Sequence, residues 1–292
     1  MTDTQTPEER RKLARRTVLA AGGVAVTAIG VGGAFTVGAE ASDREDDACC
    51  TLTSELVEGP YYIDADKIRQ DVTEDQPGIP LALRLKVIDA QTCRPVRNAA
   101  VDIWHCNATG VYSGYEETGS GGGGGGPSGP PPSGTPTDSP TGVPTGSPPP
   151  GGGGGHQEPT DDKRYLRGTW RTDRHGDVAF RTVFPGWYQG RCVHIHVKVH
   201  VDGVWTDAGY EGGHTCHTGQ LFFDERSVLL TAAVEPYASN TTTRTTLDED
   251  GIYPGNGHEG GLLYLDYDRR RIARGVHARL TLGVTPDQTH DG

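Results

Sequence analysis

The sequence predicts an all-β fold, a β-sandwich of mainly antiparallel strands with few short helices. Several segments place apolar and polar side chains at alternating positions, which is the period of a strand with one buried face. The clearest case is residues 193–201, where valine or isoleucine takes every second position. Gly-containing turns separate these segments, and no long stretch has the 3.6-residue period of an amphipathic helix.

In chain order, the alternating segments predict the individual strands. The first, residues 81–87, sets leucine and valine against alanine, arginine and lysine. Turn residues interrupt the pattern at 89–98 and at 173–176. Short helical turns are expected near 64–68 and 224–234. Strands are expected at 81–87, 99–105, 166–172, 178–184, 193–201, 219–223 and 276–282.

The first 41 residues have the pattern of an export signal. A basic head ends in Arg15-Arg16, an apolar Gly/Ala-rich run follows at 18–37, and Ala39-Glu40-Ala41 offers a small-x-small cleavage site. The arginine pair resembles a twin-arginine signal. We therefore expect residues 1–41 to direct export, so that the protein is extracellular or associated with the cell envelope, with no stable membrane insertion after cleavage. The alternative is an uncleaved membrane anchor, because the run is almost long enough to span a bilayer.

Residues 42–292 are expected to form one domain that a long insert interrupts. From 118 to 160 the chain is almost entirely Gly, Pro, Ser and Thr, with runs of six and of five consecutive glycines. Such a tract cannot bury apolar surface, so it is predicted to be disordered. The strands before it do not complete a core, which favours an insert within one domain over a boundary between two domains.

Net charge and cysteine content narrow the partners and the destination. The formal net charge is −12, which argues against nucleic acid and anionic membrane surfaces as partners. Six cysteines fit an oxidising destination, and the absence of a Cys-x-x-Cys pair argues against a zinc knuckle. Disulfide pairing is left open, except that about eight extended residues separate Cys93 from Cys106, which is too far for a disulfide.

A His-x-His pair in the strand at 193–201 is the clearest chemical feature. His194 and His196 lie on one face of the strand, with Cα atoms about 7 Å apart, so both imidazoles can converge on one metal ion. The alternative is that they form, with Lys198 and His200, an ordinary polar strand face.

Two tyrosines accompany this pair. Tyr188 stands six residues before His194, across a Gly-containing turn that also holds Arg191. Tyr112 lies in a Gly-Val-Tyr-Ser element after the strand that ends near Trp104. A phenol has a pKa near 10, so it ionises at neutral pH only beside a strong Lewis acid such as Fe(III), which prefers hard oxygen donors. Phenols and imidazoles are therefore donors that a ferric ion can use.

These motifs resemble the intradiol dioxygenase family, which includes the protocatechuate and catechol ring-cleaving enzymes. The resemblance runs from about residue 50 to residue 284 outside the insert, and it is closest to exported, single-domain members. It implies one Fe(III) per chain, held by Tyr112, Tyr188, His194 and His196, with Tyr188 as the ligand that the substrate displaces. Cys192 departs from the pattern, because many relatives have a non-thiol residue there.

The resemblance also implies roles for residues around the iron. Arg191 would stabilise negative charge that develops during the reaction. Gln220, in a Thr-Gly-Gln-Leu element, matches a family position near the substrate. The segment from Glu58 to Tyr62 resembles the family's entry segment. Pro60, Tyr61 and Tyr115 are expected to line the substrate pocket, and the alternative is that the tyrosines are amphipathic wall residues.

The implied reaction is the cleavage of a catechol-type ring by O2, between the two hydroxylated carbons, to give a muconate-type diacid. The implied partners are therefore a catechol and O2. One alternative is an exported, non-catalytic β-sandwich that binds a ligand, although such a module does not require Tyr112 and Tyr188. Another is a zinc or copper protein that uses His194 and His196. The sequence leaves open which catechol is the substrate, whether the signal is cleaved, and whether the chain forms a homodimer.

Overall fold

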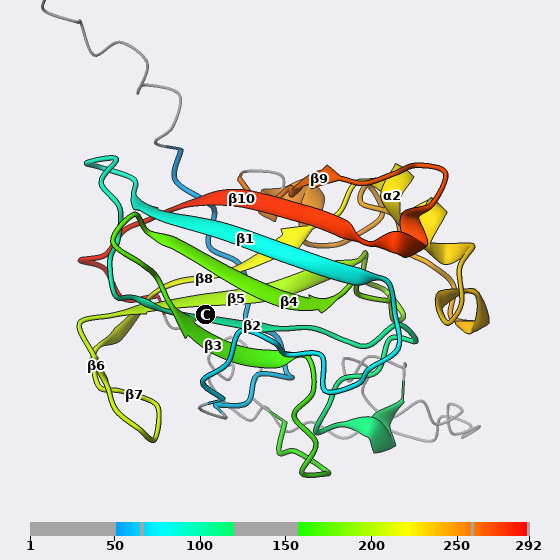
Figure 1. Cartoon of the computed structure of the whole chain (residues 1–292), viewed down its shortest axis with the longest axis horizontal. Coiled ribbons are helices and arrows are strands. Elements are labelled where there is room, and N and C mark those ends of the chain that lie inside the picture. The colour runs from blue at the N-terminus through cyan, green and yellow to red at the C-terminus, as the bar shows by residue number, and fades with distance from the viewer. Residues whose placement is uncertain (1–50, 65–66, 120–156, 258–259, 291–292) are drawn as a thin grey trace, which may run out of the picture. The chain divides into compact units, whose positions relative to one another are not determined.

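The computed structural model describes residues 51–64, 67–119, 157–257 and 260–290 (Figure 1). The predicted export signal at 1–41 and residues 120–156 of the predicted insert lie outside this range. Strands and a few short helices make up the described part, which confirms the predicted all-β sandwich. No helix in these residues is both long and apolar enough to cross a membrane.

One four-stranded sheet has the strand order β4-β1-β10-β9. β1 pairs in parallel with β10, and the other neighbours pair antiparallel. In β1, Leu83 and Leu85 are buried whereas Arg84 and Lys86 are exposed, as the alternation predicts. The strands are β1 (Pro80–Asp89), β4 (Asp177–Val183), β9 (Tyr264–Asp266) and β10 (Val276–Val284).

The other four-stranded sheet has the order β3-β2-β5-β8, with every pair antiparallel. The two sheets pack face to face (Figure 1), and Val197 and Val199 of β5 join Leu83 of β1 in the apolar core between them. Because strand side chains alternate, His194 and His196 point to the opposite face. The strands are β2 (Ala100–Trp104), β3 (Arg167–Arg171), β5 (His194–Val201) and β8 (His214–Phe222).

Short elements connect the strands of the two sheets. Helix α2 (Glu225–Ala232) begins at Asp224, whose side chain accepts a hydrogen bond from the Ser227 amide. The Tyr237 hydroxyl donates to the Phe184 carbonyl oxygen at 2.6 Å and so fixes the turn after α2 to the core. The remaining elements are η1 (Glu116–Thr118), η2 (Tyr237–Ser239), η3 (Tyr253–Gly257), η4 (Ile272–Arg274) and a ribbon of β6 (Val204–Trp205) and β7 (Tyr210–Glu211).

Three departures from the expected elements have local causes. The described residues of 64–68 are not helical, because Ile68 forms a β-bridge with Thr169 at the edge of the sheet. β8 begins earlier than the expected strand at 219–223, because its first half carries polar side chains that obscure the alternation. The three-residue strand β9 was not expected, since it is too short to show a period.

Four cysteines lie among the described residues. Cys106, Cys192 and Cys216 are buried and free, whereas Cys93 is disulfide-bonded. The free thiol of Cys106 confirms that it does not pair with Cys93. Cys192 packs against Phe222, and burial raises the pKa of its thiol well above the ordinary value, so the group stays protonated at neutral pH.

Both ends of the predicted insert contact the folded domain. Gly119 closes η1, which follows directly on Tyr115. On the other side, the Gln157 carbonyl oxygen accepts a hydrogen bond from the Tyr115 hydroxyl at 2.7 Å, and the Thr160 amide donates to the Gly114 carbonyl oxygen at 2.7 Å. The two ends therefore meet at one place beside Tyr115.

Candidate metal centre

The strand register brings residues that are distant in sequence into one row of the β3-β2-β5-β8 sheet. The aligned positions across the four strands are Arg167, Trp104, His196 and Gln220. Residues 53–62, the cover segment, begin beside Gly283 of β10 and pass along the edge of β8, where the Leu56 amide donates to the carbonyl oxygen of Thr218. The segment then lies over the row, since Gly59 packs on His196 and the Tyr62 ring contacts Trp104.

The two imidazoles of β5 converge as the sequence predicts. Their Nε2 atoms are 3.1 Å apart, and both side chains are buried. Nδ1 of His194 lies 2.7 Å from the Cys192 carbonyl oxygen and must donate to it, which leaves the Nε2 lone pair facing His196. The ring of His196 stacks on Trp104 with 4.8 Å between centroids. Trp104 is therefore a wall of this centre.

Two loops deliver the tyrosines to the same point. Tyr188, in the loop between β4 and β5, has its hydroxyl 3.3 Å from Nε2 of His194. Tyr112 follows a turn in which the Asn107 side chain accepts hydrogen bonds from the backbone at 109 and 111. The Tyr112 ring centroid lies 5.7 Å from that of Tyr188 and 6.2 Å from that of His196. All four predicted iron ligands are thus brought together.

The electrostatics of the four side chains suit a cation. Burial raises the pKa of Tyr112 and of Tyr188 well above the ordinary value, and burial lowers the pKa of both histidines. The Tyr112 hydroxyl has no hydrogen-bond partner among the described residues. A buried phenol without a hydrogen-bond partner is costly, and a positive ion among these four side chains would relieve that cost. These residues therefore fit a hard metal ion.

Arg191 and Gln220 also meet at this centre, next to an acid that the sequence reasoning missed. The guanidinium donates to Asp250 Oδ2 at 2.9 Å and to Gln220 Oε1 at 2.5 Å. Gln220 in turn donates to the Val57 carbonyl oxygen at 3.0 Å. The Arg191 side chain is 17% exposed, whereas Asp250 is fully buried, so Arg191 marks the side of the centre that solvent reaches.

The predicted pocket residues are close to the ligands, but two of them stand behind a ligand. The Tyr61 ring stacks on Tyr112 at 4.7 Å and touches Tyr115 at 4.9 Å, and both residues are buried. Pro60 is half-buried, and its carbonyl oxygen accepts a hydrogen bond from the Gln157 amide. Tyr61 and Tyr115 therefore support the position of Tyr112. A contact of these residues with substrate stays a prediction.

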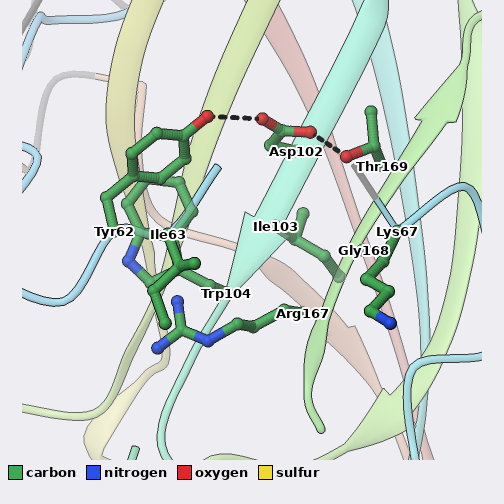
Figure 2. A pocket seen from close by; sticks show the side chains of 9 residues that line it. All are labelled: Tyr62, Ile63, Lys67, Asp102, Ile103, Trp104, Arg167, Gly168 and Thr169. Carbon is green, nitrogen blue, oxygen red and sulfur yellow. Dashed lines mark hydrogen bonds between the residues drawn. The ribbon is translucent and has the colours of Figure 1, made fainter. Parts of the chain in front are cut away.

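Arg167 is a second residue that the sequence reasoning missed. Its buried guanidinium donates to the carbonyl oxygens of Tyr61 and Ser113 at 2.6 and 2.8 Å, which ties the cover segment to the loop of Tyr112. The sequence predicts only that Arg167 lies in a strand. Its position beside Trp104 follows from the pairing of β2 with β3, which the sequence does not show. Trp104 and Arg167 line a cavity of about 20 Å³ (Figure 2), which is large enough for a water molecule and too small for an aromatic ring.

Other side chains among the described residues do not form a second metal site. Among residues 51–290, as far as they are described, no cluster of three or more His, Cys, Asp or Glu side chains could hold a metal. His105 is separate from the centre, since its ring nitrogens contact the Cys106 carbonyl oxygen and the Thr182 hydroxyl, each at 2.7 Å. A site on β5 therefore depends on tyrosine oxygens as well as on the two histidines.

Two sequence comparisons match parts of the chain. A family model described as "Dioxygenase" matches residues 57–122, which include the cover segment from Val57 onward and Tyr112. Catechol 1,2-dioxygenase of Acinetobacter baylyi is 36% identical over 84 residues, which are 26% of this chain and 27% of that protein. The matched region thus spans about a quarter of the length of this curated relative.

The fold comparison covers more of the molecule. The intradiol ring-cleavage dioxygenase of Tetranychus urticae superposes with a TM-score of 0.63 at 29% identity, over 83% of this chain and 98% of that chain. A second solved dioxygenase gives a TM-score of 0.64, with the same identity and coverage. The chain is therefore similar in sequence and in fold to the intradiol ring-cleavage dioxygenases, which confirms the resemblance predicted from its motifs.

Proposed function

We propose that the chain is a non-haem Fe(III) dioxygenase that cleaves catechol-type aromatic rings between the two hydroxylated carbons and releases muconate-type diacids. The observation that carries this proposal is the convergence of Tyr112, Tyr188, His194 and His196 in one buried centre. Two phenols and two neutral imidazoles form a hard, oxygen-rich donor set that suits Fe(III) better than a soft metal.

These four side chains would hold one Fe(III). When bound, the ion supplies Lewis acidity that lowers the pKa of the phenols and of a coordinated catechol and withdraws electron density from the ring. The pKa of both tyrosines is raised by burial, so the phenolate forms depend on that ion. Both histidines are neutral and can bind a metal ion through a ring nitrogen, because burial lowers the pKa of each well below its ordinary value.

Other groups of the chain would handle protons and charge. Tyr188, whose Oη is directed at the ligand cluster, would be the phenolate with the ion bound and would then accept at Oη one of the protons that a catechol gives up on binding. Arg191 lies on the side of the centre that solvent reaches, and Asp250 fixes its orientation. Its positive charge would stabilise negative charge that develops on the substrate. Gln220 accepts a hydrogen bond from Nη2 of the same guanidinium and helps to keep it in that position.

The same proposal includes export. Support comes from the sequence alone, in the twin-arginine-like pattern and the cleavage-type Ala39-Glu40-Ala41. Catechol-type substrates and O2 would then be met outside the cytoplasm. A fractionation experiment with wild-type and Arg15→Lys/Arg16→Lys chains tests this part, because loss of export only in the variant is the expected result.

Metal analysis combined with a substrate panel tests the proposed function. The purified protein should contain about one iron per chain and should absorb visible light, since phenolate–Fe(III) pairs are coloured. Oxygen uptake should follow addition of catechol, protocatechuate or a lignin-derived catechol. A colourless protein that contains zinc, and that iron does not reconstitute, would overturn the proposal in favour of the zinc alternative.

A further inference from the structure

A buried ion pair lies next to the metal centre without belonging to it. Lys198 and Glu58 are 6% and 5% exposed, and the ammonium contacts the carboxylate directly. Lys198 stands two residues after His196 on the same face of β5, in the row of the sheet that follows the row of His196. Glu58 belongs to the cover segment. The pair therefore joins the sheet that carries the ligands to the chain that covers it.

Both chain neighbours of Glu58 contact the centre. On one side, the Val57 carbonyl oxygen accepts the hydrogen bond from Gln220, the residue that contacts Arg191. On the other side, Gly59 packs so closely on His196 that an added Cβ would lie 3.3 Å from the imidazole Cε1. Displacement of Glu58 would thus move a contact of His196 and a contact of Gln220 together.

Lys198 also holds the far end of the cover segment. Its Nζ lies 4.3 Å from the ring centroid of Tyr62, within the range of a cation–π contact. The Tyr62 hydroxyl donates to Asp102 at 3.1 Å, and the same carboxylate accepts a hydrogen bond from Thr169 (Figure 2). His200 contacts Asp102 at 3.0 Å. One ammonium group therefore fixes the cover segment at residue 58 and at residue 62.

We propose that Glu58 and Lys198 are positioning residues: their ion pair holds the cover segment in register over β5 and thereby sets the position of His196, of the wall formed by residues 59–62, and of the Gln220 contact. Well-packed apolar side chains could supply equal stability at such a site, whereas a paired charge specifies one register of the segment. The effects on KM and on the phenolate–iron band rest on the proposed function, whereas the positioning of the cover segment does not.

The test compares Glu58→Gln, Lys198→Met and the double variant with wild type, on the full chain as purified. The double variant leaves no unpaired buried charge, so it keeps the test valid if a single variant does not fold. Amide hydrogen exchange across residues 56–62 should accelerate at least about tenfold, because removal of one partner from a buried ion pair is strongly destabilising and local opening governs exchange. The phenolate–iron absorption band should shift, and KM for catechol should rise more than kcat falls. Lys198→Arg should restore part of each effect.

Val199→Ala is the matched control, because Val199 is buried on the opposite face of the same strand and its truncation destabilises without touching the cover segment. It should lower the melting temperature and leave the exchange rates at 56–62, the band and KM as in wild type. If the Glu58 and Lys198 variants behave like Val199→Ala, the pair is only structural and the inference is wrong. If wild type binds no iron and opens no catechol, the proposed function fails, while the exchange rates still decide whether the pair positions the segment.

Discussion

At the scale of single residues, different contacts hold each proposed iron donor. His194 is oriented by the Cys192 carbonyl oxygen, and His196 is held between Trp104 and Gly59. Tyr112 has ring contacts but no hydrogen bond from its hydroxyl among the described residues. A donor held on both sides should keep its position when the metal is absent, whereas a phenol held only by ring contacts should depend more on the ion.

The first prediction concerns ligand roles. His194→Ala or His196→Ala removes one of four protein donors, so iron affinity should fall at least about 100-fold, the upper range for loss of an outer-shell partner. Tyr188→Phe should keep most of its iron and lose most of its turnover, because Tyr188 is the proposed proton acceptor. Iron content and oxygen uptake measure the two effects. Wild-type turnover in Tyr188→Phe would show that the assigned role is wrong.

The second prediction concerns Gly59. Its φ of +80° is in the left-handed region, and a Cβ would press on His196. Gly59→Ala should therefore lower the free energy of unfolding by about 1–2 kcal/mol and should shift the visible band. Gly212, with φ of +71° and no atom within 4 Å of an added Cβ, is the matched control. Equal spectra for Gly59→Ala and Gly212→Ala would mean that the contact with His196 has no effect on the metal.

The sequence predicts which site residues lie together when they belong to one short motif. It does not predict the neighbours of residues that strand pairing or a distant loop brings together. Tyr188, Arg191 and the two histidines lie within one short segment, so their grouping could be predicted. Asp250 reaches Arg191 from an irregular loop far along the chain, and Lys198 gains its partner only when the cover segment crosses β5. Neither contact follows from spacing.

At the scale of elements, β5 connects the core and the candidate metal centre because both of its faces are buried. Its valines pack between the sheets, and its polar side chains face the cover segment. The alternating strands were therefore predicted correctly, whereas β8 was underestimated, since its buried face carries Thr218 and Gln220 in place of apolar residues. Burial of polar residues through specific partners leaves no hydrophobic period in the sequence.

A contact between the two sheets gives a prediction about pH. His105, just after β2, donates from Nδ1 to the Cys106 carbonyl oxygen and accepts at Nε2 from Thr182 of β4, which requires the neutral ring. Burial lowers the pKa of His105 to about 4. The unfolded chain takes up the proton near pH 6.5 and the folded chain does not, so stability is full above pH 6.5 and is lost as the pH falls toward 4.

The expected loss from this residue is on the order of 3 kcal/mol. In metal-free protein, His105→Gln should be less stable than wild type at pH 8 and should show a smaller decline between pH 6.5 and 4, by denaturant unfolding. An identical decline in wild type and variant would show that His105 does not contribute to acid sensitivity.

At the scale of the whole molecule, the sandwich is one folding unit whose long Gly/Pro tract begins and ends at the same place. Gly119 and Gln157 both lie beside Tyr115, so a short connection can replace what lies between them. Within 120–156 the only large apolar side chain in the sequence is Val143. The composition predicted the insert, but the anchoring of its ends at Pro60 and Gly114 required the structure.

The prediction for this tract is that it is dispensable for the reaction. Replacement of residues 120–155 by a short Gly/Ser linker should keep iron content and turnover, and should raise the free energy of unfolding by no more than about 1–2 kcal/mol through a shorter loop. The comparison uses metal analysis, thermal unfolding and oxygen uptake. A variant that folds and binds iron yet has lost most of its turnover would show that the tract takes part in catalysis.

The most direct test of the central claim is the identity of the product. Iron-loaded protein is incubated with catechol under O2, and the product is analysed by mass spectrometry and ultraviolet absorption. A centre of two tyrosines and two histidines predicts cleavage between the hydroxylated carbons and therefore a muconate. A yellow semialdehyde, which results from cleavage beside the two hydroxyl groups, would contradict the account of the site.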